Sequence, residues 1–306
     1  MIELDHASRW YKQVIGINDI SCQIGPGITA LLGPNGAGKS TMLKLITGQM
    51  RPTTGRVTVM GAAPFANPNV FRRLGYCPEI ENNYDEMTGR EFVTFLAVMA
   101  GIPSSSLASK VDEAIATVGM TERADRKIGG YSKGMRQRIK VAQGIVHDPE
   151  VLILDEPLNG LDPMGRRDMS TLLFALAQRG KCVVVSSHIL HEVEQLTHNI
   201  LVLHKGRLLA QGDIYQIRSM IDAHPHRIAI TSPQSRLLAQ MLLSAPFVLS
   251  ARLDRSDASR VEIETHAPDM FYTYFPELAL ANNFEITRFE SPDNNLESIF
   301  KYLVNG

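Results

Sequence analysis

The sequence predicts an α/β protein in which a mostly parallel sheet covered by helices is followed by a smaller α+β unit. Two short, largely apolar runs, residues 28–32 and 151–154, are typical of buried strands in such a sheet. Helical patterns alternate with strand patterns as far as about residue 221. Beyond that point the expected order is strand, helix, strand, strand, helix, strand. The change of order predicts two domains, 1–221 and 222–306.

A glycine-rich loop joins the first apolar run to a predicted helix over residues 39–47, which ends at Gly48. Residues 33–40 fit the phosphate-binding pattern G-x-x-x-x-G-K-[ST] at every fixed position. Glycines let backbone N–H groups face a phosphate, and the helix N-terminus adds a partial positive charge. We expect Lys39 to bridge the β- and γ-phosphates and Ser40 to ligate Mg²⁺. The residues of this loop predicted to bind a nucleotide are Gly33, Pro34, Asn35, Gly36, Ala37, Gly38, Lys39, Ser40 and Thr41.

The remaining elements of the first domain follow from periodicity and turn residues. Strands are predicted at 2–4, 15–24, 57–60, near 75–77, and at 183–185, 200–203 and 208–210. Helices are predicted at 88–99, 111–118, from 132 or 133 onward, 163–178 and 189–196. Thr88 and Glu91 form a capping box at the start of the first of these helices. Met99, Met120 and Met169 occupy apolar positions and are expected in the core.

The second domain is predicted to contain strands at 227–231, on either side of 254–259, and at 285–289, with helices at 235–243, 269–281 and 295–303. This βαββαβ order predicts a ferredoxin-like unit. Its sequence contains no phosphate loop, metal-ligand cluster or basic stripe.

The composition limits the classes of function. The chain has 31 basic and 32 acidic residues, which gives no electrostatic reason to expect nucleic acid as a partner. No apolar stretch approaches the ~20 residues that cross a bilayer. Three cysteines, odd in number and without metal-ligand spacing, are expected to be buried thiols in a reducing cytosol. We therefore expect a soluble, cytosolic chain.

Two adjacent carboxylates, Asp155 and Glu156, follow the apolar run at 151–154. Asp155 is placed to hold Mg²⁺, directly or through water, and Glu156 to polarise an attacking water. The alternative is an acidic pair that only ends a strand at the surface. A phosphate loop upstream favours the first interpretation.

Together these motifs resemble the nucleotide-binding subunits of ABC transporters over residues 1 to about 220. Tyr11 stands where that family stacks an aromatic ring on adenine, and Trp10 is the neighbouring candidate; a packed core aromatic is the alternative for Tyr11. Residues 131–135, Tyr-Ser-Lys-Gly-Met, are similar to the family's signature sequence, Asp162 to its D-loop and His188 to its switch histidine. The resemblance implies a P-loop NTPase fold: a RecA-like core, an antiparallel β-subdomain and a helical subdomain over about 86–146.

The resemblance also implies how the site works. ATP lies between Lys39 of one chain and Ser132 of another in a head-to-tail homodimer. Ser132 and Gly134 supply a hydroxyl and a backbone N–H to the γ-phosphate. Glu156 acts as base, His188 holds the γ-phosphate and orients the water, and Asp162 links the two sites.

Two departures from the family pattern affect this site. Glu79 replaces the usual glutamine; it keeps an oxygen ligand for Mg²⁺ but adds a charge, or it lies in a solvated loop. Lys133 and Met135 replace glycine and glutamine in the signature, and Lys133 either adds charge near the phosphate or is solvated. Such variants, and the C-terminal unit ending at 296–300, are similar to the ABC-2-type export branch.

The predicted function is ATP hydrolysis coupled to transport. The chain would dock on a separate permease, through the groove around residues 79–95, at the cytoplasmic face of the membrane. Two other classes remain open: a soluble ABC-type ATPase acting on ribosomes or DNA, and a regulatory module that switches without transporting.

Overall fold

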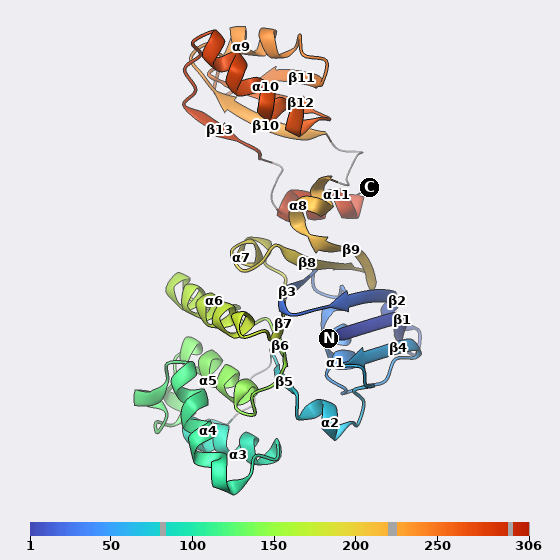
Figure 1. Ribbon diagram of the computed structural model, residues 1–306, viewed down its shortest axis with the longest axis vertical. Coiled ribbons are helices and arrows are strands. Elements are labelled where there is room, and N and C mark those ends of the chain that lie inside the picture. The colour runs from blue at the N-terminus through green and yellow to red at the C-terminus, as the bar shows by residue number, and fades with distance from the viewer. Residues whose placement is uncertain (80–83, 220–224, 293–295, 306) are drawn as a thin grey trace. The chain divides into compact units, whose positions relative to one another are not determined.

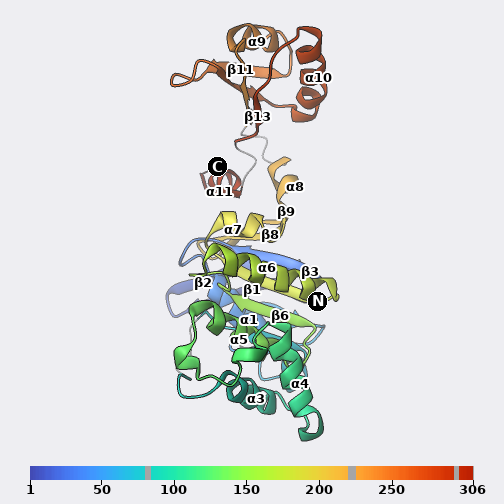
Figure 2. The same cartoon turned by 90° about the vertical axis from the view of Figure 1, so that its left-hand side faces the viewer.

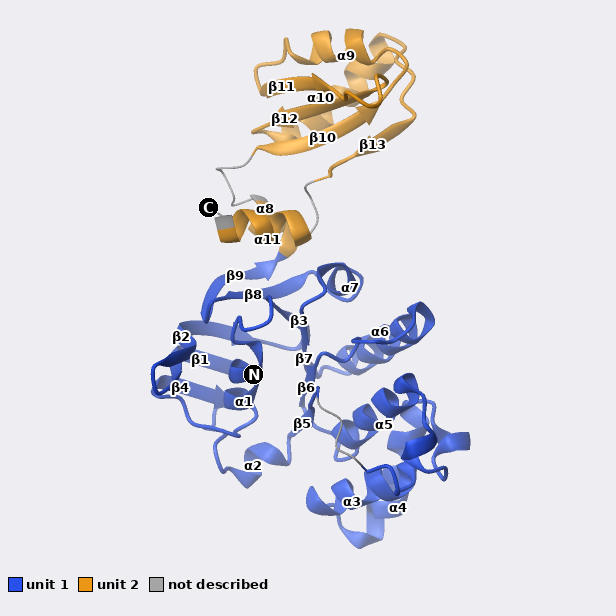
Figure 3. Cartoon of the chain, turned by 180° about the vertical axis from the view of Figure 1, so that it is seen from behind, with its two compact units in different colours: residues 1–213 blue, residues 214–306 orange. Residues whose placement is uncertain are grey.

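The computed structural model describes residues 1–79, 84–219, 225–292 and 296–305. Contacts divide the chain into two compact units, residues 1–213 and 214–306 (Figure 3). The boundary predicted between 221 and 222 lies outside the described residues. Within the ranges given above, no helix is long and apolar enough to cross a membrane.

The first unit is built on a six-stranded sheet with the order β5-β6-β7-β3-β8-β9. Its strands are β3 (Gly27–Leu32), β5 (Leu74–Cys77), β6 (Val151–Asp155), β7 (Cys182–Ser187), β8 (Asn199–His204) and β9 (Arg207–Asp213). All neighbours are parallel except β9, which runs antiparallel to β8. Every residue of β6 and β7 is buried because both faces of the sheet are covered. The prediction of a covered parallel sheet is confirmed.

A second, antiparallel sheet has the order β2-β1-β4 and packs with helix α1 on one side of the main sheet (Figure 1). Its strands are β1 (Ile2–Tyr11), β2 (Val14–Ile24) and β4 (Thr54–Val59), and α1 spans Lys39–Ile46. Strand β1 continues well beyond the predicted residues 2–4. His6 has φ 47° and the register shifts between Leu4 and Ala7, so a bulge breaks the alternation on which the prediction depended.

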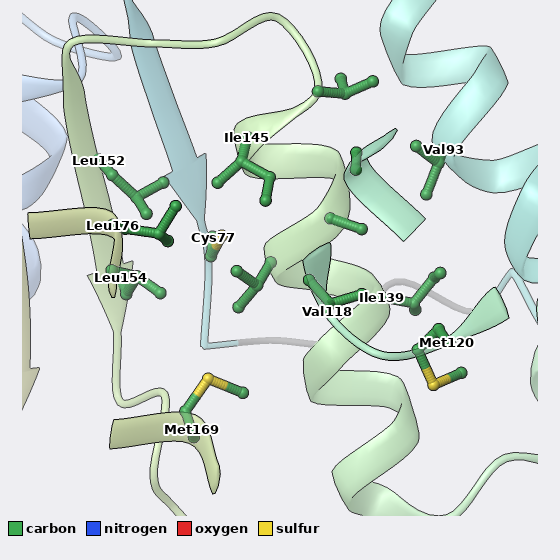
Figure 4. Close-up of a cluster of buried hydrophobic side chains, with 14 of the residues drawn as sticks. Cys77, Val93, Val118, Met120, Ile139, Ile145, Leu152, Leu154, Met169 and Leu176 are labelled. Atoms are coloured by element: carbon green, nitrogen blue, oxygen red, sulfur yellow. The ribbon is translucent and has the colours of Figure 1, made fainter. Parts of the chain in front are cut away.

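Helices cover the other side of the main sheet (Figures 1 and 2). They are α5 (Lys133–Ile145) and α6 (Pro163–Gln178), and α3 (Gly89–Met99) and α4 (Ser104–Thr117) pack in turn against α5. The unit also contains α2 (Pro68–Phe71), α7 (Leu190–Glu194) and two 3₁₀ turns, Thr121–Arg123 and Ile128–Gly130. The buried side chains of α5 and α6 meet those of β5 and β6 in one apolar core (Figure 4). A Cβ added to Gly75 of β5 would lie 2.0 Å from the carbonyl oxygen of Gly144 in α5, so this close approach requires glycine.

Local signals in the helical stretch are mostly confirmed. Thr88 accepts from the N–H of Glu91 and the Glu91 carboxylate accepts from that of Thr88, so the capping box is present. The helix predicted at 111–118 begins earlier, at Ser104. The prediction missed its first turns because they are rich in serine and carry no apolar stripe. Met120 and Met169 are buried as predicted, but Met99 is 71% exposed, so its placement in the core was wrong. Met99 is the last residue of α3, beyond the turns that pack inward.

The three cysteines, Cys22, Cys77 and Cys182, are buried free thiols, as predicted. Burial raises the thiol pKa of both Cys22 and Cys77 to about 12 and that of Cys182 to about 11. All three are therefore packing residues and not reactive nucleophiles.

The second unit contains a four-stranded antiparallel sheet with the order β11-β12-β10-β13. Its elements are α8 (Ile214–Ser219), β10 (His226–Thr231), α9 (Ser235–Leu242), β11 (Val248–Leu253), β12 (Arg260–Thr265), α10 (Pro268–Ala281), β13 (Arg288–Glu290) and α11 (Leu296–Asn305). Strand β13 starts three residues later than predicted, where Arg288 first pairs with Thr231. The aromatic rings of Phe271 and Phe275 stack at 5.6 Å within the core of this unit.

Candidate active site

A cleft of about 500 Å³ lies at the carboxyl ends of the parallel strands. The residues after β3, β5, β6 and β7 all contribute to it, as expected for a ligand site in an open α/β sheet. Its lining includes these predicted site residues: Tyr11, Pro34, Asn35, Gly36, Ala37, Gly38, Lys39, Ser40, Thr41, Glu79, Asp155, Glu156 and His188. The fold therefore brings together residues that are more than 170 positions apart in the chain, counted from Tyr11 to His188 (188 − 11 = 177).

The phosphate loop holds a shape that only glycine permits at two positions. Gly38 has φ 108°, and a Cβ there would lie 2.6 Å from the carbonyl oxygen of Gly16. Gly33 is not part of the cleft lining, but a Cβ on it would lie 2.4 Å from the carbonyl oxygen of Leu203. No side chain caps the N-terminus of α1, so its first backbone N–H groups are available to an anion.

Three charged or titratable side chains meet at the floor of the cleft. The Lys39 ammonium donates to the carbonyl oxygen of Gly33 at 2.7 Å and lies 3.6 Å from Oε1 of Glu156. The other carboxylate oxygen of Glu156 lies 2.9 Å from Nδ1 of His188. The Lys39 and Glu156 side chains are only 8% and 7% exposed, whereas the His188 side chain is 36% exposed. A carboxylate that contacts both the phosphate-loop lysine and a histidine is placed to act on a water next to a γ-phosphate.

Asp155 ends strand β6, and its carboxylate accepts a hydrogen bond from a serine that was not among the predicted site residues. Ser186 of the neighbouring strand donates to Oδ1 of Asp155 at 2.5 Å and accepts from the N–H of Glu156 at 2.9 Å. No sequence motif marks Ser186. Its importance follows only from the parallel register, in which Asp155 and Ser186 are partners.

The donors around Asp155 fit a magnesium ion that arrives with a nucleotide. Ser40, Glu79 and Asp155 line the same cleft and offer oxygen ligands, which Mg²⁺ prefers. Among the described residues no group of three or more His, Cys, Asp or Glu side chains could hold a metal by itself. Mg²⁺ at nucleotide sites uses one or two carboxylates together with phosphate oxygens and water, so no such group is required.

Tyr76 lies on β5, and the pKa of its hydroxyl is shifted mainly by burial. Burial, and after it the charge of Asp155, raises the pKa of the Tyr76 hydroxyl above its ordinary value. Tyr76 therefore stays a neutral hydroxyl beside the carboxylates.

Tyr11 lies at the edge of the cleft with its side chain partly exposed. Its hydroxyl lies 3.5 Å from Oγ1 of Thr41 and donates to the sulfur of Met50 at 3.2 Å. Val14, Ile15 and Gly16 of the same hairpin also line the cleft, and so does Asn159; none of the four was among the predicted site residues. Val14 and Ile15 are 67% and 50% exposed, and exposed apolar side chains at a cleft favour contact with a ligand. That exposure could not be recognised in the sequence, where these residues lie well before the loop.

Three predicted contact residues, Ser132, Gly134 and Asp162, are absent from the lining of this cleft. Ser132 caps α5 by accepting from the N–H of Met135 at 3.3 Å. Asp162 caps α6 by accepting from the N–H of Gly165 at 2.7 Å. One chain by itself therefore does not bring the signature sequence to its own phosphate loop.

The signature lysine has a distinct position. A Cβ added to Gly160, which has φ 69°, would lie 1.9 Å from Nζ of Lys133. The end of the Lys133 side chain therefore lies against Gly160, two residues before Asp162.

The loop, the parallel sheet and the cleft define a P-loop nucleotide-binding protein. Comparison with known proteins specifies the family: the family model described as "ABC transporter" matches residues 17–159. The chain is 33% identical over 213 residues to the Nod factor export ATP-binding protein I of Burkholderia pseudomallei (strain K96243), covering 69% of this chain and 70% of that protein. It is 28% identical over 308 residues to the "Uncharacterized ABC transporter ATP-binding protein YxlF" of Bacillus subtilis (strain 168), over the full length of both.

A solved structure described as the dimeric structure of MJ0796, a bacterial ABC transporter cassette, shares the fold. It aligns with a TM-score of 0.64 at 22% identity and covers 70% of this chain and 98% of that one. The chain thus belongs to the ABC transporter family. It is an ATP-binding subunit with the ABC ATPase fold, and its second unit adds an antiparallel sheet to that fold.

Proposed function

We propose that two copies of this chain bind and hydrolyse ATP·Mg²⁺ between them, and so drive a separate membrane permease in the direction of export. Residues 1–221 form the ATP-binding domain, with a helical subdomain at about 86–146, and residues 222–306 form an accessory domain. The observation that carries this proposal is the placement of Glu156 between Lys39 and His188 in a cleft lined by the phosphate loop.

In this proposal each side chain on the floor of the cleft has one task. Lys39 holds the β- and γ-phosphates, and the loop N–H groups and Thr41 complete the phosphate site. Glu156 accepts the proton of the attacking water, and His188 orients that water and holds the γ-phosphate. Mg²⁺, bound by Ser40, Asp155 and Glu79, would supply neutralisation of phosphate charge. Tyr11 stacks on adenine.

The head-to-tail homodimer is supported by what one chain lacks. Ser132 and Gly134 lie outside the chain's own cleft, and Ser132 is exposed at the N-terminus of α5. A second copy places its Ser132 and Gly134 against the γ-phosphate, and Asp162 connects the two sites. Nucleotide binding then favours the closed dimer, and loss of the γ-phosphate favours opening. The dimeric cassette with the same fold supports this assembly.

A smaller apolar cleft is the proposed docking site for the permease. It measures about 150 Å³ and is lined by Tyr76, Pro78, Tyr84, Phe92, Leu96 and further residues of the helical stretch. On α3, which supplies Phe92 and Leu96 to this cleft, the apolar side chains of Phe95, Val98 and Met99 are 47%, 54% and 71% exposed. Contiguous exposed apolar side chains favour a protein partner. Docking there would hold the chain at the cytoplasmic face of the membrane; residues 80–83 of the predicted groove lie outside the described residues.

The export direction is supported by the name of one relative, a Nod factor export protein.

For the accessory domain we propose a ferredoxin-like fold. The strand order β11-β12-β10-β13 and the antiparallel pairing are those expected of a βαββαβ unit with two crossover helices.

Substitution of Glu156 tests the proposal. Glu156→Gln should bind ATP·Mg²⁺, lower the hydrolysis rate by ~10²–10⁴-fold, the usual contribution of a general base, and accumulate as a dimer. Steady-state phosphate release and light scattering measure the two effects. Glu150→Gln, directly before the other end of β6, is the matched control and should change neither. A Glu156→Gln variant that turns over at the wild-type rate would remove Glu156 from this role.

Substitution of Ser132 tests the proposed dimer. Adding Ser132→Ala to the Glu156→Gln variant should abolish the ATP-dependent dimer. If the doubly substituted protein still dimerises with ATP·Mg²⁺ as before, the signature sequence does not contact the nucleotide of the partner.

A further inference from the structure

Ser186 is a buried polar residue whose hydroxyl is used twice at the active site. Its side chain lies on β7 with 0% of the residue exposed. The hydroxyl donates to Oδ1 of Asp155 at 2.5 Å and accepts from the backbone N–H of Glu156 at 2.9 Å. A serine hydroxyl has one proton to donate, and here that proton is committed to the Asp155 carboxylate.

The contact to Asp155 selects one oxygen of that carboxylate. Oδ1 is occupied by the hydroxyl proton, and among the described residues no side chain or backbone group donates to Oδ2. Asp155 is 6% exposed and faces the cleft, so Oδ2 is the oxygen free to ligate a cation. A hydrogen bond of this kind also fixes the rotamer of the ligand before the ion arrives.

The contact to Glu156 holds a strained turn. Glu156 has φ 51°, a left-handed conformation that non-glycine residues rarely adopt and that surrounding contacts must maintain. The bond from its N–H to Ser186 fixes the backbone where the chain leaves β6. This conformation directs the carboxylate toward Lys39 at 3.6 Å and His188 at 2.9 Å. One hydroxyl thus orients two functional carboxylates with different tasks.

We propose that Ser186 is a positioning residue of the ATPase site: its hydroxyl presents Oδ2 of Asp155 to Mg²⁺ and keeps the Glu156 turn in its left-handed conformation. The register of the sheet produces this arrangement, because the parallel pairing of β6 with β7 makes Asp155 and Ser186 direct neighbours. The next residue, Ser187, does not share it. The Ser187 hydroxyl instead accepts from the N–H of Ile189 at 3.0 Å, in the loop after the strand.

The test measures metal binding separately from turnover. The full-length protein is titrated with Mg²⁺ in the presence of a fluorescent, non-hydrolysable ATP analogue, and analogue binding is measured again in EDTA. Removing a residue that orients a metal ligand typically weakens metal affinity 10- to 100-fold, so Ser186→Ala should raise the Mg²⁺ midpoint by about that factor and leave binding in EDTA unchanged. Ser186→Thr, which keeps the hydroxyl, should restore the midpoint, and Ser187→Ala should leave it at the wild-type value.

Because this role rests on Asp155 being the magnesium ligand proposed above, Asp155→Asn is measured in the same series. If Asp155→Asn leaves the Mg²⁺ midpoint unchanged, the proposed metal site fails. If Asp155→Asn raises the midpoint but Ser186→Ala does not, the metal site stands and the role of Ser186 is refuted. The role of Ser186 is also refuted if Ser186→Ala weakens analogue binding equally with Mg²⁺ and in EDTA. Such a loss would not depend on the metal and would come from a general structural defect. Should alanine prevent folding, Ser186→Cys provides the same comparison with a residue of similar volume and a weak donor.

Discussion

The ion pair between Arg166 and Glu192 connects helix α6, which follows Asp162, to helix α7, which follows His188. Its contribution to stability can be tested quantitatively. Arg166 lies in the first turn of α6, just after its N-cap Asp162, and Glu192 lies on α7, just after His188. Nε of Arg166 is 3.1 Å from Oε1 of Glu192, yet neither atom forms a hydrogen bond, so the pair is held by charge. The Glu192 side chain is 2% exposed and that of Arg166 is 34% exposed.

Arg166→Met removes the positive partner and leaves a buried carboxylate without compensation. Breaking a buried pair in this way costs about 3–5 kcal/mol. For a unit of 213 residues, each kcal/mol lowers the melting temperature by about 2–4 °C, which gives a loss of ~6–20 °C. Arg73→Met is the matched control, because its partner Glu150 is 46% exposed and exposed pairs contribute only about 0–1 kcal/mol.

Differential scanning calorimetry of the full chain measures the effect. Because the chain has two units, the relevant transition is the one that ATP·Mg²⁺ moves upward, since a ligand stabilises only the unit that binds it. Replacing both Arg166 and Glu192 with methionine should recover most of the loss, since no buried charge then remains. Equal shifts for Arg166→Met and Arg73→Met, or no recovery in the double variant, would refute the assignment of a buried, charge-compensating pair.

Two further predictions concern the metal site and pH. Glu79→Gln removes a negative charge from the cleft and should change the Mg²⁺ dependence of hydrolysis; identical Mg²⁺ and pH profiles for variant and wild type would place Glu79 outside the cation site. Burial lowers the pKa of His147, so as pH falls below about 6.5 the unfolded chain takes up the proton first and the folded state loses stability. His147→Gln should therefore reduce the drop in melting temperature between about pH 7.5 and pH 5, and an unchanged drop would assign it to other groups.

The sequence alone was sufficient wherever the signal lies within a few neighbouring residues. The phosphate loop, the capping box at Thr88 and the carboxylates after 151–154 are local patterns, and the structure has each of them where the sequence predicts it. Covered parallel strands could be recognised because burial on both faces requires continuous apolar residues. The bulge at His6 and the early start of α4 were not predicted, because neither gives a regular spacing of apolar residues in the sequence.

Only the tertiary structure decided which distant residues meet. Ser186 and Glu192 carry no recognisable motif, and their partners are fixed by strand register and by the packing of α6 beside α7. Met99 satisfies a helical apolar pattern yet points outward, since a pattern gives the face of a helix but not where that face stops being covered. Ser132 matches its motif but lies outside the chain's own cleft. The physical reason is common to all four: local spacing sets backbone conformation, whereas contacts between elements depend on a three-dimensional arrangement to which residues throughout the chain contribute.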